Sequence, residues 1–123
     1  MKPFKDLHHE AMRLADEAAA KRRQGNGALA GERLRQAFAC ERQAADLVAA
    51  DFSLEPTRSV LHRSAASLAL ECGELREAER LIAVALSGDP PADIAEELRD
   101  LLEQVYFGSK KGRRPLTKTT EIS

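Results

Sequence analysis

Apolar residues recur every three or four positions along most of this 123-residue chain, which is the spacing of helices that bury one face. Glycine and proline interrupt the pattern in four places, at "QGNG", "DFSLEP", "ECGE" and "SGDPP". No segment alternates apolar and polar residues as a half-buried strand would. We therefore predict an all-α fold of five helices, which cover approximately residues 3–23, 28–50, 56–72, 75–86 and 91–106.

Small residues in the fourth predicted helix have a spacing that indicates close helix packing. Gly73 precedes this helix, where a glycine can adopt the left-handed backbone that ends the helix before it. Ala78 and Ala85 follow on one face, and Pro90 stops the helix. The third predicted helix has small residues of its own, Ala65, Ala66 and Ala69. We predict that these two helices form an antiparallel hairpin in close contact.

This arrangement resembles the tetratricopeptide repeat, a helical hairpin of roughly 34 residues. When the repeat is aligned with residues 59–92, the chain matches it at the small, turn, contact and terminal proline positions. These positions hold Ala66, Gly73, Ala78, Ile82, Ala85 and Pro90. The first helix departs from the family, because His62, Ala65 and Ala69 stand where the repeat has an aromatic residue, a leucine and a tyrosine. A fainter copy precedes this one by 48 residues, with Ala18, Gly25, Ala30, Leu34 and Ala37 at the equivalent positions.

The resemblance implies a single helical domain over residues 1–107. Its helices would form about two antiparallel hairpins stacked as a right-handed superhelix, with the fifth helix as the cap that covers the last apolar face. The alternative is an irregular five-helix bundle, whose hairpins converge on the same small-residue packing.

Charge is spread unevenly along the chain. Residues 108–123 hold five basic side chains and one acidic side chain, a net charge of +4, which leaves −5 for the rest because the whole chain carries −1. This segment has no apolar periodicity, so we expect a disordered basic tail. Its run "KKGRR" suits nonspecific contact with phosphates, but no aromatic residues are interleaved for base stacking, which favours a solvated tail over a nucleic-acid-binding one.

The cysteine content and the apolar runs bear on the compartment. The start, "MKPFKDLHHE", is too polar for a signal peptide, and no apolar run approaches the roughly 20 residues that span a membrane. Cys40 and Cys72 lie inside predicted helices, so we expect both to be reduced. A cytoplasmic protein without a membrane partner is predicted.

The sequence shows no arrangement of residues typical of catalysis. His8 and His9 are adjacent, so on a helix they point about 100° apart and do not readily share one metal ion. We expect His8 to border the core and His9 to face water. No glycine-rich phosphate loop or nucleophile motif is present. We therefore predict a non-enzymatic protein that needs no metal or cofactor.

Proteins that resemble the tetratricopeptide repeat commonly bind a peptide or a partner helix on the concave surface formed by the first helix of each pair. Transferring that surface to this chain gives six candidate partner-binding residues, Met12, Arg22, Arg63, Ser67, Leu70 and Glu71. We expect the two arginines to meet acidic groups of a protein partner, and Met12 or Leu70 to contact an apolar anchor. Two alternatives are a nucleic-acid-associated accessory protein that uses the tail, and a self-associating structural protein such as a homodimer.

Overall fold

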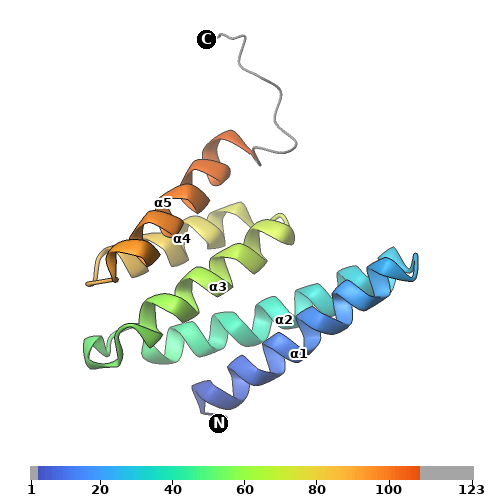
Figure 1. The fold of residues 1–123 in the computed structure, drawn as a ribbon, viewed down its shortest axis with the longest axis horizontal. Helices are drawn as coiled ribbons and strands as arrows, with labels where there is room; N and C mark the ends of the chain where they lie inside the picture. Colours follow the sequence, from blue (N-terminus) through green and yellow to red (C-terminus); the bar gives the residue numbers. More distant parts are fainter. Residues whose placement is uncertain (1–2, 109–123) are drawn as a thin grey trace, which may run out of the picture.

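The structure is a computed structural model that describes residues 3–108, and these residues form five α-helices and one short 3₁₀ helix (Figure 1). The all-α prediction is confirmed, and no strand occurs between residues 3 and 108. Apart from Gly108, the predicted tail lies outside the described residues. The elements are α1 (Phe4–Arg23), α2 (Gly27–Val48), η1 (Phe52–Leu54), α3 (Thr57–Glu71), α4 (Leu75–Leu86) and α5 (Ala92–Phe107).

The two hairpins, α1–α2 and α3–α4, reverse direction through the same turn. At the end of α3, the amide of Gly73 donates to the carbonyl of Leu70, and the amide of Glu74 donates to the carbonyl of Ala69. The end of α1 has the equivalent bonds, from Gly25 to Arg22 and from Asn26 to Lys21. Both glycines have positive φ, at 76° and 79°, so each hairpin depends on a residue without a side chain.

The helices stack in chain order (Figure 1). Helix α1 packs on α2, α2 packs on α3, and α3 packs on α4, while α5 covers both α4 and α3. Helices α1, α3 and α5 run in the same direction and α2 and α4 run in the opposite one. The tip of the α1–α2 hairpin projects past the end of α3, so only the first part of α1 lies beside α3.

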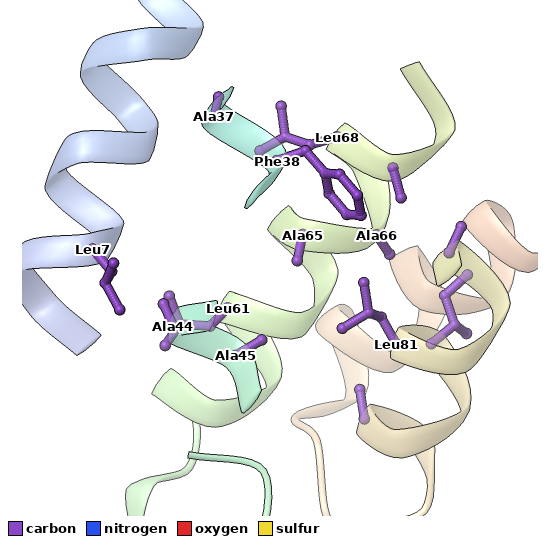
Figure 2. Packing of buried hydrophobic residues seen from close by; sticks show 14 of the residues in the cluster. Leu7, Ala37, Phe38, Ala44, Ala45, Leu61, Ala65, Ala66, Leu68 and Leu81 are labelled. Atoms are coloured by element: carbon purple, nitrogen blue, oxygen red, sulfur yellow. The ribbon is translucent and has the colours of Figure 1, made fainter. Parts of the chain in front are cut away.

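Alanine fills much of the interface between the helices (Figure 2). Ala65, Ala66 and Ala69 of α3 are fully buried, as are Ala78 and Ala85 of α4. Larger side chains fill the space between these close contacts; they include Phe38, Leu61, Leu68, Leu81, Ile82 and Leu98. The burial predicted for the small residues of the α3–α4 hairpin is therefore confirmed.

A buried arginine joins the two hairpins. The side chain of Arg58, in the first turn of α3, is only 1% exposed. Its Nε donates to the carbonyl of Ala49 (2.6 Å), and its Nη2 donates to the carbonyl of Val84 (2.9 Å). These carbonyls end α2 and belong to the last turn of α4, where the helix dipole places partial negative charge. One guanidinium thus satisfies the ends of two helices that are distant in sequence.

Glu55 balances the charge of Arg58, and Phe52 and Gly88 pack closely around its guanidinium. Nη1 lies 3.3 Å from the carboxylate of Glu55, and the guanidinium stacks 4.6 Å from the ring centroid of Phe52. Burial favours the neutral form of Glu55, but hydrogen bonds from Ser59 and the charge of Arg58 outweigh it and lower the pKa of this carboxyl. A Cβ at Gly88 would overlap Nη1 of Arg58, so a side chain at this position would require the buried guanidinium to shift.

Candidate functional site

Two cavities follow one another along α3, on the side that faces α1. The first, about 290 Å³, lies beside the start of α3, and we call it the histidine cavity. It is lined by Phe4, Lys5, His8, His9, Pro56, Thr57, Val60 and Leu61. The second, about 460 Å³, lies farther along α3 and is also bordered by α5, and we call it the acidic cavity. It is lined by Met12, Arg63, Ser64, Ser67, Leu68, Glu97, Asp100 and Leu101.

The helical spacing of the lining residues places the two cavities in line. On α3, most of them recur at intervals of three or four from Thr57 to Leu68, which is a single stripe about 17 Å long. On α1, Lys5, His8 and Met12 form the matching stripe. We call the surface that contains both cavities the α1–α3 face. Its length suits an elongated ligand.

The acidic cavity combines an apolar floor with a negatively charged rim. Arg63 of α3 forms an ion pair with Glu97 of α5, with 2.6 Å between Nη1 and Oε1. Asp100, one turn farther along α5, is exposed and forms no ion pair or hydrogen bond with another described residue. With one cation against two carboxylates, the rim is net negative. We expected Arg63 to be available for acidic groups of a partner, but the structure pairs it within the chain.

The histidine cavity has a different chemistry. His8 Nδ1 lies 2.9 and 3.0 Å from the two carboxylate oxygens of Glu41, a fully buried residue of α2. This contact fixes the imidazole at the cavity wall beside Lys5 and the exposed His9. The expectation that His8 borders the core and His9 faces water is confirmed. The rest of the lining is mostly apolar, so this end of the α1–α3 face joins apolar walls to basic side chains.

The structure brings three of the six predicted residues together and separates the other three. Met12, Arg63 and Ser67 line the acidic cavity. Leu70 is half-buried on α3 beyond the cavity, and Glu71 is the exposed last residue of that helix. Arg22 is exposed near the hairpin tip that projects past α3 (Figure 1), so it does not belong to the α1–α3 face.

Sequence reasoning missed the contribution of α5. Glu97, Asp100 and Leu101 form one wall of the acidic cavity. The sequence predicted α5 only as a cap over the last apolar face, and nothing in its periodicity indicates that some of its carboxylates turn toward α1. An ion pair between α3 and α5, such as Arg63–Glu97, is visible only once the helices are placed.

His62 is a buried histidine near the α1–α3 face but not part of either cavity. Its Nδ1 donates to the carbonyl of Arg58 at 2.7 Å, and its Nε2 has no hydrogen-bond partner. Burial lowers the pKa of this imidazole below 6.5. The nearby charges act in opposite directions, because Asp46 raises the pKa of His62 while Arg58 and Arg80 lower it. His62 is therefore neutral in the folded protein near neutral pH.

Protonation of His62 is expected to destabilise the fold at mildly acidic pH. The folded-state pKa lies below the unfolded value of 6.5, so the unfolded chain binds the proton first, and stability is lost as pH falls below 6.5 and through the folded pKa. One such group contributes a slope of up to about 1.4 kcal/mol per pH unit. Chemical denaturation between about pH 7.5 and 5 should show this slope, and His62→Leu should reduce it.

A matched control for this experiment is His9→Gln, because His9 is exposed on α1. This variant should keep the wild-type slope. An unchanged slope in His62→Leu would show that another group causes the loss of stability.

No group of three or more His, Cys, Asp or Glu residues among residues 3–108 is arranged to hold a metal ion. None of the helices in this part of the chain is long and apolar enough to cross a membrane. Comparison of the chain with protein-family models, with curated proteins and with solved structures gave no match. The function must therefore be inferred from the geometry of the α1–α3 face.

Proposed function

We propose that this protein is a non-enzymatic interaction module of the tetratricopeptide-like kind, which binds an extended segment of a partner protein along the α1–α3 face. The observation that carries the proposal is the alignment of two cavities on one stripe of α3. In this proposal the two hairpins are stacked as a right-handed superhelix, and α1, α3 and α5 supply its inner surface.

The dimensions favour a peptide over a small molecule. A stripe of about 17 Å corresponds to about five residues of extended chain at roughly 3.3 Å per residue. Each cavity has the size of a large side chain or more and includes apolar lining residues, so each suits one anchoring side chain. Two anchors a few residues apart would fix both the position and the direction of the segment.

The charges of the two cavities predict the chemistry of that segment. Asp100 favours a lysine or arginine at the acidic cavity. Lys5 and the exposed His9 favour an acidic or polar residue at the other end, whereas His8 is already bonded to Glu41. The partner segment that fits best therefore has a basic and apolar half and an acidic and apolar half. This reverses the simpler expectation of an acidic partner, since Arg63 is already paired with Glu97.

The cysteines fit an intracellular location. Cys40 and Cys72 are both free thiols and are half-buried on α2 and just after α3. Thiols persist in reducing compartments, so we place this module in the cytoplasm.

Self-association is a second candidate function, which exposed apolar side chains at one end of the fold favour. Leu75 begins α4 with 46% of its surface exposed. Tyr106 and Phe107, which end α5, are 62% and 53% exposed. A homodimer that covers these side chains would show a mass that depends on concentration in sedimentation or light-scattering measurements.

The main proposal predicts that peptides selected for binding depend on the acidic cavity. Peptides from a displayed library that bind the wild-type chain should bind Asp100→Lys about three to ten times more weakly, because the change replaces an attraction with a repulsion. Ser67→Phe, which places a ring in the cavity, should abolish binding. Dissociation constants from fluorescence anisotropy measure both effects.

Glu96→Lys is the control for Asp100→Lys, because Glu96 is exposed on the same helix but does not line the cavity. It makes the same change in charge and should alter peptide affinity less than about twofold. Circular dichroism checks that all variants are folded. Equal weakening by Asp100→Lys and Glu96→Lys, with Ser67→Phe binding normally, would place the peptide elsewhere.

A further inference from the structure

The acidic cavity matches a segment of this chain that the structure does not describe. The cavity presents Asp100, which has no partner among the described residues, beside an apolar floor of Met12, Leu68 and Leu101. A ligand suited to it carries positive charge next to one apolar side chain. The sequence after α5 contains this combination in "RRPL", residues 113–116.

The charges of the two neighbouring segments are opposite and equal. Helix α5 holds five acidic side chains and one arginine, a net charge of −4. Residues 108–123 carry +4. Two segments that adjoin in the chain are held at high effective concentration, so even a weak attraction between them is populated.

The chain after α5 is long enough to reach the cavity. Asp100 lies about 10 Å back along α5 from Phe107, at 1.5 Å per residue. Arg113 is six residues beyond Phe107 and extends up to about 20 Å, whereas Leu116 extends up to about 30 Å. This reach covers the return along α5 and the roughly 8–10 Å between packed helices. Gly108 ends α5 with φ of 78°, so the chain leaves the helix direction at once.

We propose that residues 113–116 of the chain's own C-terminal segment occupy the acidic cavity, with the arginines at Asp100 and Leu116 against Met12 and Leu68. This inference rests on the proposed function, since it names a resident ligand for the same α1–α3 face. The segment then competes with the partner peptide for the same cavity. Any change that removes positive charge from the segment weakens this competition.

The test compares the full-length chain with two full-length variants of equal charge. Arg113→Glu with Arg114→Glu reverses the two arginines of the proposed ligand. Lys110→Glu with Lys111→Glu reverses two lysines that lie closer to α5 and serves as the matched control.

NMR signals of the cavity report its occupation directly. We expect the arginine variant to shift the methyl signal of Met12 and the amide signals of Ser67 and Leu101, and the lysine variant to leave them near their wild-type positions. At about 1 M salt the wild-type signals should move to those of the arginine variant, because the attraction is screened. Leu116→Ala, which changes no charge, should shift the Met12 methyl signal.

Two NMR outcomes overturn the proposal. Cavity signals that are the same in all variants, at low and high salt, show that the segment does not occupy the cavity. Cavity signals that change on dilution assign the cavity to the C-terminal segment of a second copy of the chain.

Peptide binding separates this inference from the proposed function. If the segment fills the cavity for nine-tenths of the time, selected peptides bind the arginine variant about tenfold more tightly than the wild-type chain. Equal affinity, with binding still lost in Ser67→Phe, refutes the resident ligand and leaves the proposed function standing. If no peptide depends on Ser67, and none depends on Asp100 when Asp100→Lys is made in the arginine variant, where the segment does not compete, the proposed function fails. The NMR comparison still decides the occupation of the cavity because it uses no peptide.

Discussion

Replacement of Arg58 by alanine is expected to lower the free energy of unfolding by about 3–5 kcal/mol, which is the range for removing one partner of a buried ion pair. The change leaves the carbonyls of Ala49 and Val84 without their donor and the carboxylate of Glu55 without its cation. It also removes a large side chain from a site that is 1% exposed. Urea denaturation followed by circular dichroism measures the loss. Arg58→Lys should lose less stability than Arg58→Ala, because an ammonium group keeps the positive charge but lacks the planar set of N–H donors of a guanidinium.

Arg76→Ala is the control for this effect. Arg76 is an exposed arginine at the start of α4, and its removal should change stability by less than about 0.5 kcal/mol. Gly88→Ala should also lower stability, because its Cβ would overlap Nη1 of Arg58 and displace the guanidinium from its hydrogen bonds. A wild-type stability in Arg58→Ala would mean that the ends of α2 and α4 are held by other contacts.

Ala78→Leu and Ala85→Leu are each expected to cost about 1–3 kcal/mol by overpacking. Both alanines are fully buried in α4, which packs directly on α3. A leucine adds three carbon atoms where the neighbouring side chains already fill the space, so the two helices must separate or adopt strained rotamers. Thermal and urea denaturation measure the cost.

Ala83→Leu makes the same change on the exposed side of α4 and should be close to neutral, within about 0.5 kcal/mol. Equal stability of all three variants would show that the buried alanines are not close contacts. The alignment with the tetratricopeptide repeat would then lose its main support.

The helices were predictable because local sequence controls them. Apolar spacing defined all five, and the positive-φ glycines Gly25 and Gly73 marked both hairpin tips within a residue or two. The buried charges were not predictable. Arg58 and Glu41 are long polar residues within helices, where exposure is the rule. Their burial depends on partners that lie elsewhere in the chain, Val84 for Arg58 and His8 for Glu41, so no local pattern reveals it.

The candidate site was predictable only where it follows one helix. The resemblance to the tetratricopeptide repeat supplied Met12, Arg63 and Ser67 as candidates. They line one cavity because the residues that share one face of a helix are a local property of its sequence. Arg22 was wrongly included in the surface because it lies near the end of α1, past the part of α1 that overlaps α3. That overlap depends on how the two hairpins are offset and not on the sequence of either helix. Glu97 and Asp100 were missed for the same reason, since the tilt of α5 decides which of its carboxylates reach the cavity.

The exposed end of α5 gives the protein an optical signal of its own. The chain has one tyrosine and no tryptophan, so its tyrosine fluorescence comes from a single ring, Tyr106. The hydroxyl of Tyr106 donates to the carboxylate of Glu79 on α4, and this bond raises the pKa of the phenol above its ordinary value. Detachment of α5 breaks the bond and alters the emission, even while the other four helices retain their circular dichroism. The last helix therefore carries a label-free probe that distinguishes its local opening from unfolding of the whole domain.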